Sequence, residues 1–140
     1  MISRVLIADD EPLARERVAH CVAQLAPAAT VECVGDGAAA IDAVHRFQPH
    51  AVLLDIQMPG RSGFEVIEAI GPEQMPPVVL VTAYDAYALR AFELAAVDYL
   101  LKPFNLERFA SAWQRIERVH AQGALADEAH RLSALLAAVD

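Results

Sequence analysis

VLIADDEP, residues 5–12, passes directly from four apolar residues to three acidic ones and a proline. A short apolar run without alternation is typical of a strand that is buried on both faces of a parallel sheet. Pro12 suits the first turn of a helix. The stretch therefore predicts a buried strand, a turn that carries Asp9 and Asp10, and a helix beyond the turn.

Further segments of the chain repeat this pattern. Residues 51–54, 78–81 and 97–101 are also apolar runs, the last broken only by Asp98, whereas residues 31–34 alternate and suit an edge strand. Segments of helical period lie between them: Val18, Cys21, Val22 and Leu25 share one face, and Leu106, Phe109, Ala110, Trp113 and Ile116 share another. Five alternating strand and helix units predict an α/β fold with a parallel sheet covered on both faces.

Length and charge restrict the function. A chain of 140 residues with 56% hydrophobic residues suits one domain. A net charge of −8 disfavours direct binding to nucleic acid or to an anionic membrane. The apolar runs are too short to span a membrane, and no signal peptide is recognised, so we expect a cytoplasmic protein. Cys21 and Cys33 are expected to be reduced and without chemistry.

Each apolar run ends in a polar side chain. These residues are Asp9 and Asp10 after the first strand, Asp55 after the third, Thr82 after the fourth and Lys102 after the fifth. Because parallel strands gather their carboxyl ends at one edge of a sheet, we expect three carboxylates, a hydroxyl and an amine in one cleft.

This cluster of acids predicts a bound cation. Two carboxylates about 4 Å apart repel by about 1–4 kcal/mol at surface-like dielectric, and a divalent ion replaces that repulsion with coordination. Oxygen ligands favour Mg²⁺ or Mn²⁺ over zinc. Lys102 is the only lysine among eleven basic residues, and its compact charge suits a phosphoryl oxygen. The set predicts phosphoryl transfer to an aspartate.

Four motifs together resemble the receiver domains of two-component response regulators. They are VLIADDEP, AVLLDIQMPGRSG, VVLVTAYD and DYLLKPF, and the resemblance covers about residues 4–119. It implies a flavodoxin-like, doubly wound, five-stranded parallel sheet of order 2-1-3-4-5 with five helices, and a C-terminal helical extension. We assign residues 1–122 to the receiver and residues 123–140 to a helical tail or a linker toward an effector domain.

The resemblance also implies roles for the acidic residues. Asp55 corresponds to the phosphoacceptor and is itself a metal ligand. Asp10 corresponds to a direct Mg²⁺ ligand, Asp9 to a ligand through water, and the backbone carbonyl of Gln57 to a further ligand. A sensor histidine kinase is the implied phosphoryl donor, and the chemistry is self-phosphorylation and autodephosphorylation rather than turnover of a separate substrate.

A second group of residues corresponds to the switch. Thr82 and Lys102 are expected to bind the phosphoryl group, Tyr99 to turn inward behind Thr82, and the bond before Pro103 to be cis. The face made by the fourth helix, fifth strand and fifth helix would then pair with a second receiver. Residues 82–104, TAYDAYALRAFELAAVDYLLKPF, further resemble receivers that precede a LytTR DNA-binding domain.

Two residues depart from the commonest pattern of the family. Gln57 stands where a smaller polar residue is frequent, and Tyr84 is large for its position. We expect both to tune dephosphorylation. The five histidines are scattered among predicted helices and joins, and we leave them out of the site.

Two other functions stay open on the sequence alone. An aspartyl-phosphate phosphatase of the haloacid dehalogenase type expects a second acid two residues after its nucleophile, where this chain has Gln57. A pseudo-receiver, which binds partners without phosphorylation, has usually lost one of Asp10, Asp55, Thr82 or Lys102, and all four are present.

The end of the chain has its own apolar pattern. Leu125, Ala129, Leu132, Leu136 and Val139 follow one another at alternating steps of four and three. This spacing is typical of a coiled-coil seam, and an amphipathic helix that folds back on its own receiver would show it as well.

Overall fold

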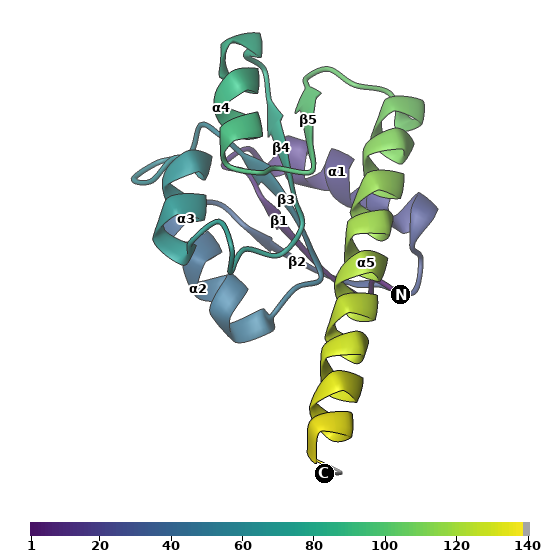
Figure 1. Cartoon of the computed structure of the whole chain (residues 1–140). Helices are drawn as coiled ribbons and strands as arrows, with labels where there is room; N and C mark the ends of the chain where they lie inside the picture. The colour runs from purple at the N-terminus through teal and green to yellow at the C-terminus, as the bar shows by residue number, and fades with distance from the viewer. Residues whose placement is uncertain (139–140) are drawn as a thin grey trace.

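The computed structural model describes residues 1–138, apart from the side chains of residues 124, 127, 128 and 138. The strands are β1 (Arg4–Ala8), β2 (Thr30–Val34), β3 (Ala51–Asp55), β4 (Val78–Thr82) and β5 (Asp98–Leu101). They form one parallel five-stranded sheet in the order β2-β1-β3-β4-β5 (Figure 1). The predicted flavodoxin-like fold is confirmed.

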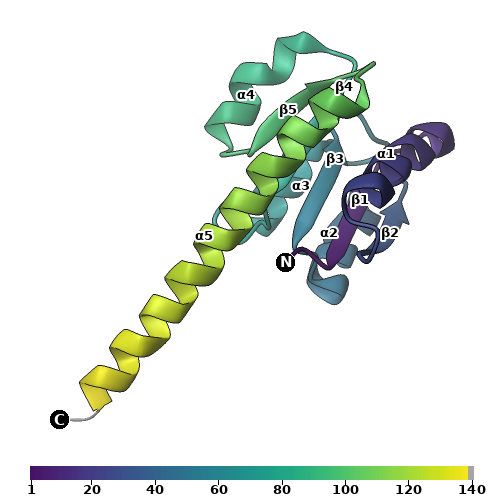
Figure 2. The ribbon, with the colours of Figure 1, turned by 90° about the vertical axis from the view of Figure 1, so that its right-hand side faces the viewer.

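Helices cover both faces of this sheet. They are α1 (Pro12–Leu25), α2 (Gly37–Phe47), α3 (Gly63–Ile70), α4 (Ala88–Glu93) and α5 (Leu106–Ala138). Helices α1 and α5 pack on one face, and α2, α3 and α4 pack on the other (Figures 1 and 2). A one-turn 3₁₀-helix, η1 (Asp85–Tyr87), precedes α4 and was not predicted.

The core consists of two apolar layers that share the central strands. Side chains of a strand point alternately to the two faces, so Val5 and Ile7 of β1 join the α1–α5 layer, whereas Leu6 and Ala8 join the α2–α3–α4 layer. The residues of β3 and β4 are all buried, which explains their uninterrupted apolar runs. The edge strand β2 is only partly buried.

Local capping fixes where the helices begin, directly beyond the strand ends. Pro12 is the first residue of α1. The Asp36 side chain accepts a hydrogen bond from the Ala39 amide at the start of α2, at 2.8 Å. Ser62 and Glu65 form a capping box at the start of α3. These short connections bring the polar strand ends and the helix starts to one edge of the sheet.

Helix α5 contains the predicted C-terminal helical extension. It is one helix of 33 residues that continues through Gly123 to Ala138, and its C-terminal half extends beyond the sheet (Figures 1 and 2). A glycine inside a helix costs only about 1 kcal/mol relative to alanine. The neighbouring Ala121, Gln122 and Leu125 favour the helix, so Gly123 does not end it.

The extension does not fold back on the receiver. Its leucines Leu125, Leu132 and Leu136 are 67%, 55% and 73% exposed. Val139, the last position of the predicted seam, lies outside the described residues. Within residues 1–138, no helix has the length and apolarity needed to cross a membrane.

Candidate functional site

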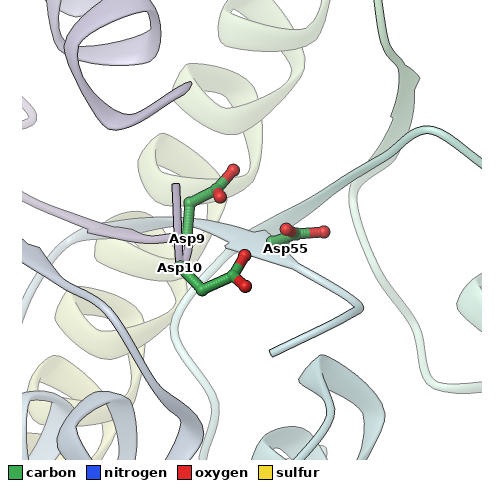
Figure 3. Close-up of side chains that lie close together, drawn as sticks. All are labelled: Asp9, Asp10 and Asp55. Atoms are coloured by element: carbon green, nitrogen blue, oxygen red, sulfur yellow. The ribbon is translucent and has the colours of Figure 1, made fainter. Parts of the chain in front are cut away.

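Three carboxylates converge where β1 and β3 end. Asp9 and Asp10 follow β1, and Asp55 is the last residue of the neighbouring β3. One carboxylate oxygen from each of them lies within 4.8 Å of those of the other two (Figure 3). Asp9 and Asp55 are buried, and Asp10 is exposed. The acidic cluster that the strand ends predicted is therefore present in the fold.

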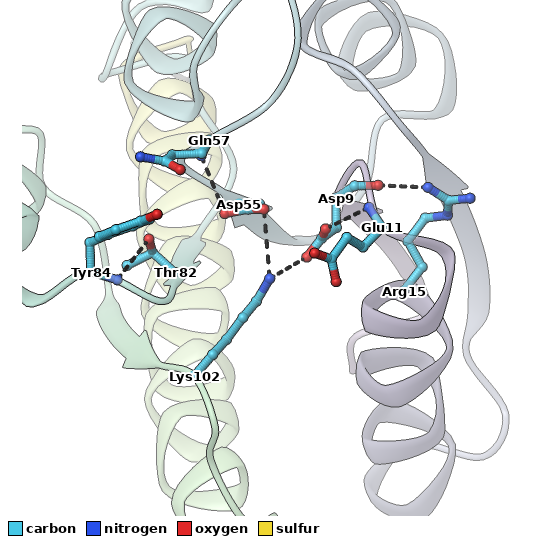
Figure 4. A network of polar contacts seen from close by, with 8 residues as sticks. All are labelled: Asp9, Glu11, Arg15, Asp55, Gln57, Thr82, Tyr84 and Lys102. Carbon is cyan, nitrogen blue, oxygen red and sulfur yellow. Dashed lines mark hydrogen bonds and ion pairs between the residues drawn. The ribbon is translucent and has the colours of Figure 1, made fainter.

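Lys102 enters this cluster from the end of β5. Its Nζ donates to Asp9 Oδ2 at 2.7 Å and lies 3.6 Å from Asp55 Oδ2 (Figure 4). Burial alone would lower the pKa of Lys102, but the hydrogen bond to Asp9 and the charge of Asp55 outweigh it and raise that pKa. The ammonium is thus charged at neutral pH. The peptide bond between Lys102 and Pro103 is cis.

One ammonium does not balance three acids. Burial raises the pKa of Asp55, Lys102 lowers it, and the charges of Asp9 and Asp10 raise it again, with a net value of about 6. The cluster therefore holds more negative charge than the protein neutralises by itself. Three hard oxygen donors without a histidine or a cysteine among them fit a divalent ion of the Mg²⁺ class.

Asp10 and Asp55 line an open cleft of about 880 Å³. Thr82 and Lys102 line it together with the two residues that depart from the family pattern, Gln57 and Tyr84. The Gln57 amide donates to Asp55 Oδ1 at 3.3 Å. This volume leaves room beside Asp55 for a phosphoryl group and its donor.

Thr82 and Tyr99 are joined through the backbone of one residue. The Tyr84 amide donates to Thr82 Oγ1 at 3.3 Å, and the Tyr99 hydroxyl donates to the Tyr84 carbonyl. Tyr99 is half-buried and is not among the residues that line the cleft. The resemblance to receiver domains predicted that Thr82 and Tyr99 act together in the switch. It gave no indication that Tyr84 connects them.

Sequence reasoning missed further residues at this edge. Arg15 Nη1 donates to the Asp9 carbonyl at 2.7 Å, and the Glu11 amide donates to Asp9 Oδ1 at 3.0 Å (Figure 4). A Cβ on Gly63 would lie 2.5 Å from the Asp55 carbonyl oxygen, so a glycine is needed for α3 to approach β3 this closely. Periodicity shows which face of a helix is buried, and it carries no information on such contacts.

The histidines are not part of the site. His50 and His120 pack against each other with ring centroids 5.0 Å apart. His50 directly precedes β3, so this pair lies at the amino end of the sheet, opposite to the acidic cluster.

Comparisons with known proteins agree with this architecture. A family model described as the response regulator receiver domain matches residues 5–114. An uncharacterized response regulatory protein of Vibrio cholerae is 47% identical over 123 residues, which are 86% of this chain and 50% of the relative. Transcriptional regulatory protein BtsR of Salmonella typhi is 43% identical over 118 residues, which are 82% of this chain and 48% of BtsR. This chain spans about half the length of these curated relatives.

A solved structure gives the same result. The response regulator protein TrrA of Thermotoga maritima, in complex with Mg²⁺ and BeF, superposes with a TM-score of 0.73 at 28% identity, and the match covers 82% of this chain and 99% of TrrA. The family model spans most of the chain, including all five strands and the acidic cluster except the first residue of β1. The chain therefore belongs to the response regulator receiver family.

Proposed function

We propose that this receiver accepts a phosphoryl group from a sensor histidine kinase on Asp55 and responds with a change of its protein-binding surface. The observation that carries the proposal is the convergence of Asp9, Asp10, Asp55 and Lys102 at one edge of the sheet. We assign the phosphoacceptor role to Asp55, because its carboxylate both lines the open cleft and lies 3.6 Å from Lys102 Nζ.

The transfer step follows from ordinary phosphoryl chemistry. A carboxylate oxygen of Asp55 attacks the phosphorus of a phosphohistidine, so that a P–O bond forms while the P–N bond breaks. The leaving imidazole nitrogen keeps the electron pair and takes up a proton. Lys102 donates to a phosphoryl oxygen, and Thr82 offers its hydroxyl from the end of β4.

We also propose that the acids hold Mg²⁺, for which Mn²⁺ can substitute. Asp10 and Asp55 would bind it directly, together with the backbone carbonyl of Gln57, and Asp9 would bind it through water. When bound, the ion supplies positive charge that offsets the charge of the carboxylates and of the phosphoryl group. The hard oxygen donors and the TrrA complex with Mg²⁺ and BeF support this assignment.

The output would start at Thr82. If its hydroxyl turns toward the phosphoryl group, the contact with the Tyr84 amide is lost and the loop to which Tyr99 is bonded is released. This loop leads into α4, where Leu89 and Phe92 are 70% and 82% exposed. Exposed apolar side chains of this size suit a protein partner, and we propose a second phosphorylated receiver that binds through α4, β5 and α5.

A transcriptional output is the further part of the proposal. We propose a LytTR-type DNA-binding domain outside this chain as the effector. The sequence of residues 82–104 and the similarity to a protein named as a transcriptional regulator support it. The chain of 140 residues carries a net charge of −8, which disfavours its own contact with DNA.

Acetyl phosphate and Mg²⁺, followed by intact-mass measurement, test the proposal. We expect one stable phosphoryl group on the wild type and none on Asp55→Ala. Asp42→Ala is the control, because this acid is 77% exposed on α2 and should label normally. Full labelling of Asp55→Ala would remove Asp55 from its role. An unlabelled wild type would indicate a pseudo-receiver, and steady phosphate release without an adduct would indicate a phosphatase.

A further inference from the structure

We propose that Arg15 is a positioning residue for the metal site: it holds the peptide between Asp9 and Asp10 so that the Asp10 carboxylate faces Asp55. This inference rests on the proposed function, in which these acids bind a divalent ion. Arg15 itself touches neither the ion nor the phosphoryl group in this scheme, and it is not among the residues that line the cleft.

Asp9 is held at each of its polar atoms. Its amide donates to the Val34 carbonyl at 3.1 Å, Oδ1 accepts from the Glu11 amide at 3.0 Å, and Oδ2 accepts from Lys102 at 2.7 Å. The remaining atom, the carbonyl oxygen, accepts from Arg15 Nη1 at 2.7 Å (Figure 4). Arg15 is therefore the side chain that holds the backbone at the carboxyl end of Asp9.

This contact matters most for the next residue. The carbonyl oxygen of Asp9 and the amide nitrogen of Asp10 belong to one planar peptide unit, so a bond to the oxygen fixes the direction in which the chain enters Asp10. Among the described amides and side chains, none donates a hydrogen bond to the Asp10 carboxylate. Its direction toward Asp55 therefore depends on the backbone that Arg15 holds (Figure 3).

The surroundings of Arg15 favour this role over a simple surface charge. Its guanidinium lies beside Gly35, where a Cβ would come within 3.3 Å of Nη1. Within the described part of the chain, Arg15 has no carboxylate within 4.0 Å, so a backbone carbonyl rather than an acid is its partner. Arg17, two residues later, is exposed and makes no such contact, which makes it a matched control on the same helix.

The test is calorimetric titration of the full chain with MgCl₂ alone. We expect Arg15→Met to bind Mg²⁺ about 10-fold more weakly, because loss of a group that orients a ligand typically costs at least this factor. Arg15→Lys should recover part of the affinity through its single ammonium donor, and Arg17→Met should bind as the wild type does. Equal affinity in Arg15→Met and the wild type would overturn the proposal.

Two further measurements separate positioning from general stability. Acetyl phosphate labelling of Arg15→Met should be slow at low Mg²⁺ and normal at saturating Mg²⁺, whereas a damaged fold would lower both. If Arg15→Met unfolds at a lower temperature without Mg²⁺, the Mg²⁺ affinity of Arg15→Gln is the deciding measurement. The glutamine amide stays polar, but it is too short to reach the Asp9 carbonyl. Wild-type affinity in that variant also overturns the proposal.

A last comparison keeps this inference apart from the proposed function. If the wild type and Asp10→Asn both fail to bind Mg²⁺, the proposed metal site is rejected, and the proposed role of Arg15 is rejected as well. If Asp10→Asn loses affinity while the Arg15 variants keep it, only the role of Arg15 is wrong.

Discussion

Lys102 shows how one residue serves two states of the site. At rest its ammonium bridges Asp9 at 2.7 Å and Asp55 at 3.6 Å. Both carboxylates have little exposure, so losing this charge would leave them repelling each other in a region of low dielectric. A compact ammonium on a flexible stem can exchange a carboxylate oxygen for a phosphoryl oxygen, which a planar guanidinium does with more difficulty.

Replacement of Lys102 by arginine tests this point. We expect Lys102→Arg to fold, to bind Mg²⁺ and to label on Asp55, but to dimerise poorly after phosphorylation. A charge-assisted hydrogen bond is worth about 1.5–3 kcal/mol, so the phosphorylation-dependent gain in dimer affinity should fall by about 10-fold or more. Sedimentation with and without acetyl phosphate measures this gain. A gain in dimer affinity equal to that of the wild type would show that the contact with the phosphoryl oxygen does not require the compact ammonium of Lys102.

Tyr84 is expected to set the lifetime of the phosphorylated state. Its side chain is 50% exposed and lines the cleft beside Asp55, so it restricts the approach of water to the aspartyl phosphate. The aspartyl phosphate of Tyr84→Ala should therefore be hydrolysed a few-fold faster than that of the wild type. Gln57→Ala should change the hydrolysis rate in the same direction. The decay of the labelled species by intact mass is the measurement. Tyr84→Phe, which keeps the ring, is the control, and a longer lifetime in Tyr84→Ala would contradict the idea.

At the scale of elements, Asp98 ties β5 to α5. Its carboxylate accepts from Arg108 at 3.0 and 2.9 Å and from Arg115 at 2.8 Å, and its Oδ1 also accepts from the Tyr99 amide. Burial alone would raise the pKa of Asp98, but the hydrogen bonds from Arg108 and Tyr99 hold it below its usual value of 3.8. The start of α5 is thus fixed beside the strand that carries Tyr99.

This contact predicts a pH dependence of stability. Because the pKa of Asp98 is lower in the folded than in the unfolded chain, its contribution to stability is complete above the usual pKa of 3.8 and is lost as the pH falls through the folded value. Asp98→Asn should cost about 1.5–3 kcal/mol at pH 7 and less than that at pH 3. Urea unfolding at both pH values measures the difference.

The control for this experiment is Glu73→Gln. Glu73 is exposed and lies outside this contact, so its replacement should change stability little at either pH. A cost of Asp98→Asn that stays constant between pH 7 and pH 3 would show that its ionised form is not what stabilises the fold.

The elements differ in how far the sequence could predict them. Strands β1, β3 and β4 were predicted because burial on both faces requires an uninterrupted apolar run. Because the carboxyl ends of parallel strands lie at one edge of a sheet, the sequence then predicted Asp55 and Lys102 in one cleft. The single turn of η1 has no periodicity to detect, and the path of α5 through Gly123 depended on helix propensities that outweigh one glycine.

On the scale of the whole molecule, α5 presents two apolar faces to different surroundings. Phe109, Trp113 and Ile116 are buried against the sheet. At about 100° per residue, Leu125 and Leu136 lie about 160° and 180° around the helix from Phe109. Leu136 therefore points away from the face that packs on the receiver, whereas Leu125 still lines a groove with Leu25 and Trp113. A partner of the extension has to approach from the outside of α5.

We expect this partner to be the extension of a second copy. Leu125, Leu132 and Leu136 follow the 4–3 spacing of a coiled-coil seam, but about two heptads are too few for a stable pair by themselves. Receivers that already pair through α4, β5 and α5 would hold two extensions at a high effective concentration, and the weak seam would then add to the affinity. The extension should matter only after activation.

Sedimentation with and without beryllofluoride and Mg²⁺ tests this expectation, on the full chain and on a chain cut after Gln122. The activated chain of residues 1–140 should dimerise at least about 10-fold more tightly than the activated shortened chain, and both should be monomeric without activation. Leu132→Ser in the full chain should behave like the shortened chain, and Ala134→Ser, off the seam, should behave like the wild type. If activation dimerises the full and shortened chains equally, the affinity comes from the receiver surface alone and the exposed leucines take no part in pairing.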